Sequence, residues 1–138
     1  MLTGLHLLLV EDTPLNAEVA GAILRSAGAA VDFAIDGVEA IEAVRRFAYA
    51  LVLMDCQLPR VDGYEATRRI RVLEAERRFE GPPRRGRLPI LALTACSTSA
   101  DLERAMLAGM DGLVAKPVDA QRLLWAVGKH VSRRPVRV

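Results

Sequence analysis

Five polar side chains directly follow short apolar runs of the chain, and their types suit the chemistry of a phosphoryl group. They are Glu11 and Asp12 after the first run, Asp55 after the third, Thr94 after the fourth and Lys116 after the fifth. A lone aspartate in such a place usually caps a helix or forms a turn. Five polar groups at the ends of four runs are hard to explain as caps, and they predict a shared site.

Three carboxylates gathered at one site repel one another and need a counter-charge. Two unit charges about 4 Å apart cost on the order of 4 kcal/mol at an effective dielectric near 20, so a proton or a cation must neutralise them. Hard oxygen ligands without a histidine or thiolate cluster favour Mg²⁺. Mg²⁺ beside the ammonium of Lys116 would bind a phosphoryl group. A carboxylate in such a site can itself act as the nucleophile and form an aspartyl-phosphate.

The apolar runs alternate with longer amphipathic stretches, which predicts strands alternating with helices. Strands are predicted at 5–10, 30–34, 51–54, 88–93 and 113–115. Side chains suited to cap the intervening helices stand at Thr13, Asp36, Asp119 and, before the fourth helix, at Ser97, Thr98 or Ser99. Five strand–helix units in series predict an α/β fold. We expect a doubly wound, five-stranded parallel sheet of order 2-1-3-4-5, flavodoxin-like, with five helices on its two faces. Ligands of such sheets bind where the strands end.

Composition narrows the class of protein. The chain has 138 residues, which fits one domain, and it is 51% hydrophobic, which argues against disorder. A net charge of +2 does not indicate nucleic-acid binding, and no apolar run approaches the ~20 residues of a membrane span. Cys56 and Cys96 have no paired spacing, which favours a reducing compartment. We therefore expect a cytoplasmic protein without direct membrane contact.

Four stretches carry a resemblance to a known family. They are LLLVEDTPLN, LVLMDCQLPRVDGYEATRRIR, LPILALTA and GMDGLVAKPV, and in this order they resemble the receiver domain of response regulators. The second resembles in particular the receivers fused to hybrid sensor histidine kinases. The resemblance implies a receiver domain over 1–131, followed by a tail or linker at 132–138. It also implies that the partner is a histidine kinase or a histidine phosphotransfer protein, while the sequence carries no signal for an oligomeric state.

The resemblance also implies a role for each polar residue. Asp55 would accept the phosphoryl group from a phosphohistidine. Asp12 and Asp55 would ligate Mg²⁺ together with the backbone carbonyl of Gln57, and Glu11 would reach the metal through water. The remaining roles fall to the ends of the last two strands: Thr94 would hydrogen-bond a phosphoryl oxygen, Lys116 would pair with the phosphoryl group, and the Lys116–Pro117 peptide bond would be cis.

One departure from the family pattern and two rival functions bear on these expectations. Leu113 stands where the family often has an aromatic residue that turns inward on activation, so the usual coupling to Thr94 is in doubt. The leading hypothesis is a phosphorelay switch that catalyses its own phosphotransfer and dephosphorylation without being a conventional enzyme. One rival is a phosphatase of the haloacid dehalogenase type, which also uses an aspartyl-phosphate. A resemblance to that class would imply the motif Asp-x-Asp after the third strand, where this chain has Asp55, Cys56 and Gln57. The other is an interaction module that works without phosphorylation.

Overall fold

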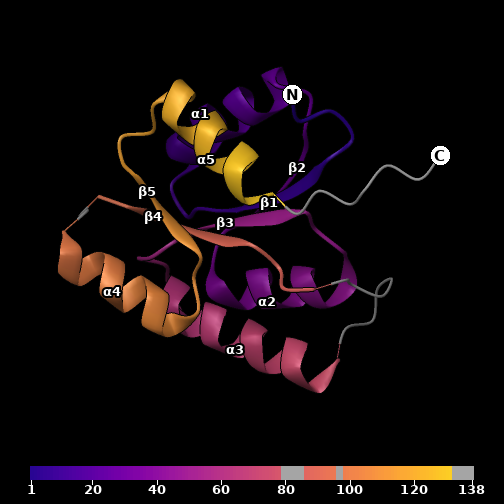
Figure 1. The fold of residues 1–138 in the computed structure, drawn as a ribbon, viewed down its shortest axis with the longest axis vertical. Helices are drawn as coiled ribbons and strands as arrows, with labels where there is room; N and C mark the ends of the chain where they lie inside the picture. The colour runs from indigo at the N-terminus through magenta and orange to yellow at the C-terminus, as the bar shows by residue number, and fades with distance from the viewer. Residues whose placement is uncertain (79–85, 96–97, 132–138) are drawn as a thin grey trace.

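The computed structural model describes residues 1–78, 86–95 and 98–131, which form a central parallel sheet between two layers of helices (Figure 1). The strands are β1 (His6–Val10), β2 (Ala30–Ala34), β3 (Leu51–Asp55), β4 (Ile90–Thr94) and β5 (Gly112–Ala115). The helices are α1 (Pro14–Ser26), α2 (Gly37–Arg46), α3 (Gly63–Glu76), α4 (Ser99–Ala108) and α5 (Ala120–His130). The strand order is β2-β1-β3-β4-β5 with every pair parallel, which confirms the predicted doubly wound sheet.

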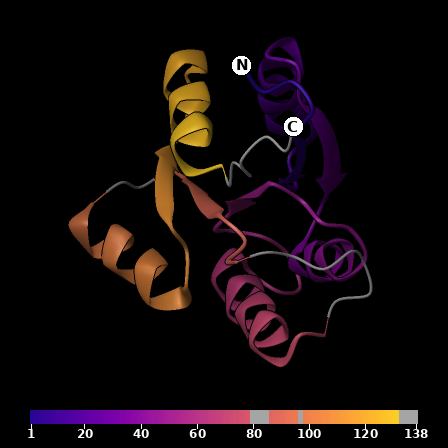
Figure 2. The same cartoon turned by 45° about the vertical axis from the view of Figure 1, so that its right-hand side comes forward.

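The two faces of the sheet are covered by different helices, as Figures 1 and 2 show: α1 and α5 lie on one face, and α2, α3 and α4 lie on the other. Successive side chains of a strand point to opposite faces. Leu7 and Leu9 of β1 therefore pack in the core under α1 and α5, while Leu8 and Val10 pack in the core under the other three helices. Burial on both faces explains why the strands read as continuous apolar runs in the sequence.

The element boundaries follow local chemistry, and beside one-residue shifts at several strand ends they depart from the sequence prediction at Thr13 and at the start of the fourth strand. Thr13 occupies the cap position of α1, but its side chain makes no capping hydrogen bond. The fourth strand begins at Ile90 and not at Leu88. Leu88 is fully buried, but its N–H donates to the Glu74 carboxylate over 2.7 Å, and Pro89 has no N–H to give to the ladder. The Pro89 carbonyl still accepts the Val52 N–H over 2.9 Å, so these two residues lead into the strand without donating to its ladder.

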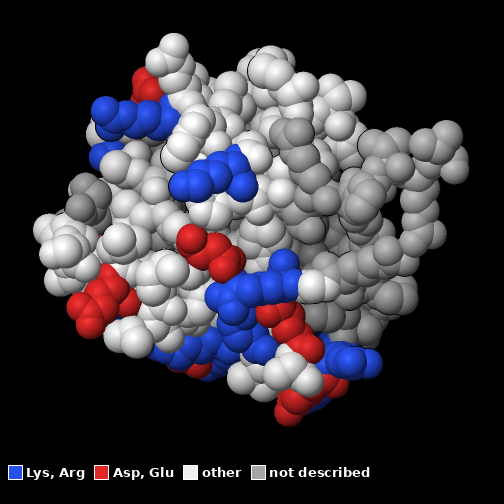
Figure 3. All heavy atoms as spheres, viewed as in Figure 1, with Lys and Arg blue, Asp and Glu red and all other residues white. Residues whose placement is uncertain are grey.

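An ion-pair network ties α3 to the segment before β5. The Arg71 guanidinium donates to Glu74 over 2.9 Å and to Asp111 over 2.9 Å, and Arg87 donates to the second oxygen of Asp111 over 2.8 Å. Figure 3 shows basic and acidic side chains interspersed in the left and lower parts of this face of the molecule. Within the described ranges, no helix is long and apolar enough to cross a membrane. The predicted tail at 132–138 and Cys96 lie outside the described residues.

Candidate functional site

The acidic residues that follow β1 and β3 meet at one edge of the sheet, as the strand pattern predicts. Carboxylate oxygens of Glu11, Asp12 and Asp55 all lie within 4.8 Å of one another. β1 and β3 are adjacent parallel strands, so their carboxyl ends lie side by side. Glu11 and Asp55 are buried, and Asp12 is exposed at the opening of the site. Two of the three carboxylates are therefore shielded from water, which strengthens their mutual repulsion.

Lys116 neutralises part of this charge. Its ammonium donates to Glu11 Oε1 over 2.8 Å and to Asp55 Oδ2 over 3.0 Å. Burial alone would lower the pKa of the lysine, but the two carboxylates outweigh burial and raise it. The Lys116 N–H also donates to the Thr94 carbonyl over 2.8 Å, and the Lys116–Pro117 peptide bond is cis, as predicted. The end of β5 thus delivers a fully charged ammonium to the carboxylate cluster.

The unmet bonding capacity of the cluster fits a divalent cation. In the part of the chain that the structure describes, Glu11 Oε2 is a buried oxygen with no hydrogen-bond partner. Burial, followed by the neighbouring Asp55 carboxylate, raises the pKa of Glu11 despite the lysine. One ammonium does not balance three carboxylates, and all the donor atoms are hard oxygens. Both properties suit Mg²⁺, which binds through one or two carboxylates and keeps several waters.

A cavity of about 240 Å³ opens beside the carboxylates and collects every predicted site residue except the buried Glu11. It is lined by Asp12, Thr13, Asp55, Cys56, Gln57, Thr94, Ala95 and Lys116. The Gln57 N–H donates to Asp55 Oδ1 over 3.1 Å, which fixes the orientation of that carboxylate. Burial raises the pKa of the Cys56 thiol, so its thiolate is disfavoured. The cavity therefore brings the Asp55 carboxylate together with Thr94 and Lys116.

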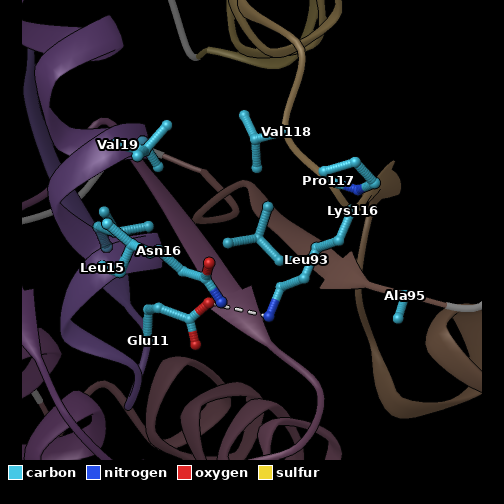
Figure 4. Close-up of a pocket in the computed structure, with 11 residues that line it drawn as sticks. Glu11, Leu15, Asn16, Val19, Leu93, Ala95, Lys116, Pro117 and Val118 are labelled. Carbon is cyan, nitrogen blue, oxygen red and sulfur yellow. Dashed lines mark hydrogen bonds and ion pairs between the residues drawn. The ribbon is translucent and has the colours of Figure 1, made fainter.

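An apolar groove that sequence reasoning missed shares Ala95 and Lys116 with this cavity, and Figure 4 shows the residues that line the groove. It has a volume of about 440 Å³, with Glu11 and Lys116 among its lining residues. We define the apolar groove by five of its apolar lining residues, which are Leu15, Val19, Leu93, Pro117 and Val118. Leu15 and Val19 are exposed and four residues apart on α1, so they share one helix face. Two apolar residues outside the buried stripe of α1 were the signal in the sequence that could have indicated this groove.

The comparisons with known proteins agree with this geometry. A family model described as the response regulator receiver domain matches residues 7–128. The chain belongs to this family. It is a receiver domain of a two-component system, which confirms the resemblance of its four motifs. The phosphatase alternative is not favoured, because the family match spans nearly the whole chain.

Similar proteins include a hybrid histidine kinase and the receiver domain of a sensor histidine kinase. Hybrid signal transduction histidine kinase B of Dictyostelium discoideum is 40% identical over 129 residues, which are 91% of this chain but 7% of that protein. The receiver domain of a Pseudomonas aeruginosa sensor histidine kinase, solved with a magnesium ion in its active-site cleft, is 41% identical with a TM-score of 0.79, covering 93% of this chain and 98% of that one.

A second solved structure comes from Saccharomyces cerevisiae. It holds the receiver domain of a response regulator together with a histidine phosphotransfer signalling protein. The alignment covers 95% of this chain and 88% of that chain, at 30% identity and a TM-score of 0.78. These relatives place the chain among the receivers of two-component signalling proteins. The chain spans only 7% of the length of the Dictyostelium kinase.

Proposed function

We propose that Asp55 is the phosphoacceptor of this receiver domain. The observation that carries the proposal is the position of its carboxylate, which is buried between Lys116 and the acidic pair yet lines an open cavity. An Asp55 oxygen forms a bond to the phosphorus of a donor phosphohistidine as the phosphorus–nitrogen bond breaks. The electron pair leaves with the imidazole nitrogen, which takes up a proton. The product is an aspartyl-phosphate.

The surrounding residues divide the remaining work. Glu11, Asp12, Asp55 and the Gln57 carbonyl would hold Mg²⁺, which when bound offsets negative charge on the carboxylates and on the phosphoryl oxygens. Lys116 stays charged and moves its hydrogen bond from Asp55 to a phosphoryl oxygen. The Thr94 hydroxyl, at the end of β4, donates to another. Because these groups are placed before the donor arrives, little reorganisation accompanies the transfer.

The aspartyl-phosphate acts as a switch and not as an intermediate of metabolic turnover. It places new negative charge and several strong acceptor oxygens where Asp55 was, which biases the loops after β3 and β4 toward a second arrangement. The domain catalyses its own phosphotransfer and dephosphorylation. The change in its surface then alters binding to a signalling partner.

The donor is a histidine kinase or a histidine phosphotransfer protein, and the apolar groove is its docking surface. Lys116 lines both the groove and the cavity that contains Asp55, which we call the acceptor cavity. A protein seated in the groove therefore reaches Asp55. Figure 4 shows Leu15 and Val19 on one wall and Val118 on the other. Apolar walls beside a charged acceptor suit a partner whose phosphohistidine lies within an apolar helix surface. The yeast relative solved with a phosphotransfer protein supports this choice of partner.

Phosphoramidate with Mg²⁺ tests the proposal without any protein donor. Mass spectrometry should find one added phosphoryl group that is stable to acid and labile to base. Asp55→Asn keeps the shape of the side chain and should lose the label, whereas Asp32→Asn on β2 should keep it. An unlabelled wild-type domain, or an Asp55→Asn variant labelled to the same stoichiometry, would refute the proposal.

A further inference from the structure

The turn between β2 and α2 touches both loops that carry the candidate metal ligands. On one side, the Glu11 N–H donates to the Ala34 carbonyl over 3.0 Å. On the other side, Arg60 of the loop after β3 donates to Asp36 Oδ2 through Nε over 2.8 Å and through Nη2 over 2.6 Å. Residues 34–37, the bridging turn, therefore connect the acidic end of β1 with the loop that contains Gln57.

The Asp36 carboxylate is buried and held in position where it accepts the hydrogen bonds of Arg60. Its side chain is only 5% exposed, and its second oxygen accepts the Glu39 N–H over 2.8 Å at the start of α2. Burial alone would raise the pKa of Asp36, but the hydrogen bonds from Glu39 and Arg60 outweigh it and lower the pKa. The carboxylate is therefore charged and fixed in position. Arg60 supplies the matching cation from a largely exposed side chain.

The backbone of the loop also rests against the bridging turn. A Cβ at Gly37 would overlap the Val61 carbonyl oxygen, so glycine permits this close approach. Arg60 has a φ of 65°, in the left-handed region that non-glycine residues rarely adopt. At the far end of the loop, Gly63 N–H donates to the Cys56 carbonyl over 3.2 Å. Residues 56–62 are thus held in one shape, and the only charged side-chain tether described for them on the β2 side is Arg60.

We propose that Arg60 is a positioning residue for the metal site. Its ion pair with Asp36 holds the loop at 56–62 against the bridging turn, and so keeps the Gln57 carbonyl aimed at a cation shared with Asp12 and Asp55. This role rests on the proposed function of the site. Arg60 does not touch the cation or the phosphoryl group, and it acts through the backbone of its loop. Replacement of a group that orients a metal ligand typically lowers the affinity of the site for the metal.

Mg²⁺ affinity measured by calorimetry separates a tether from a simple charge effect. Arg60→Ala should bind Mg²⁺ roughly tenfold more weakly than wild type. Loss of a nearby cation would by itself strengthen Mg²⁺ binding, so the sign of the change discriminates between the two effects. Arg60→Lys keeps the charge but not the planar fork and should recover part of the affinity. Arg69→Ala, which breaks an exposed pair with Glu65 on α3, is the matched control and should bind as wild type does.

Hydrogen exchange in the metal-free protein gives a second readout. Amides of residues 57–62 should exchange faster in Arg60→Ala, with the strands unchanged. Equal Mg²⁺ affinity and equal exchange in wild type and Arg60→Ala would overturn the proposal. If Arg60→Ala does not fold, Arg60→Gly, which suits the positive φ, and Arg60→Lys provide the same comparison. A wild-type domain that binds no Mg²⁺ and takes no phosphoryl group would instead refute the proposed function itself.

Discussion

The Lys116 ammonium lies 3.0 Å from Asp55 Oδ2, which joins the end of β5 to the end of β3. Removal of this ammonium in Lys116→Ala leaves two buried carboxylates without their counter-charge. Urea unfolding in the presence of a chelator should therefore show a loss of about 1–3 kcal/mol. Saturating Mg²⁺ should reduce the deficit, because the cation replaces the missing charge. A deficit that Mg²⁺ leaves unchanged would contradict this reading, and Lys129→Ala, an exposed lysine on α5, is the control.

Asp12 should decide Mg²⁺ binding, since it is the exposed carboxylate at the opening of the site. Asp12→Ala removes one of only three carboxylates in the cluster, and the remaining pair is partly satisfied by Lys116. We expect calorimetry to show no measurable Mg²⁺ binding by this variant. Glu18→Ala removes an exposed carboxylate from α1 and should leave the affinity unchanged. Wild-type affinity in Asp12→Ala would mean that the metal site is misassigned.

Leu15 distinguishes a protein donor from a small-molecule donor. Its side chain is exposed on the wall of the apolar groove and does not line the acceptor cavity. Leu15→Lys should accept phosphate from phosphoramidate at the wild-type rate. Transfer from a phosphorylated histidine phosphotransfer protein should slow roughly tenfold, because the partner loses apolar contact and meets a buried charge. Leu107→Lys on α4 should affect neither rate, and equal slowing by both substitutions would argue against docking at the groove.

Asp36 gives the fold a pH-dependent contribution whose sign can be checked. Its pKa in the folded protein lies below the ordinary value of 3.8. The stabilisation by its charged form is therefore complete above that ordinary value, and it is lost as the pH falls through the lower folded value. The stability difference between wild type and Asp36→Asn in urea unfolding should be constant near neutral pH and shrink below about pH 4. A difference independent of pH would show that the charge of Asp36 contributes nothing.

The strand-end chemistry was predictable from sequence because it depends on local order along the chain. Four of the five apolar runs end in a polar residue that reaches the site, and the parallel sheet then brings Asp55 and Lys116 together. The Arg60–Asp36 pair was not predictable, because it joins residues 24 positions apart and depends on a left-handed backbone at Arg60. Asp36 was recognised only as a helix cap, which is a local signal.

Side-chain partners at the opposite edge escaped prediction for the same reason. His6 begins β1, and its Nε2 lies 2.9 Å from Asp32 Oδ2, which also accepts a hydrogen bond from the Tyr49 hydroxyl over 2.7 Å. Trp125 follows Leu124 on α5, about 100° further around the helix axis, and it is 67% exposed. Helical spacing gives a direction around the axis, but the edge of the buried region depends on which neighbouring helices lie there.

Leu113 should limit how far the switch spreads. It pairs with Ala92 while Thr94 pairs with Ala115, so Leu113 and Thr94 project from one face of the sheet. Leu113 packs against the core that includes α4, and it lacks the ring that turns inward in the family pattern. A beryllofluoride mimic with Mg²⁺ should therefore shift amides near Asp55, Gln57 and Thr94 strongly and those of α5 weakly. Leu113→Tyr should extend the shifts to α5, and wild-type changes centred on Leu113 would show that leucine itself switches.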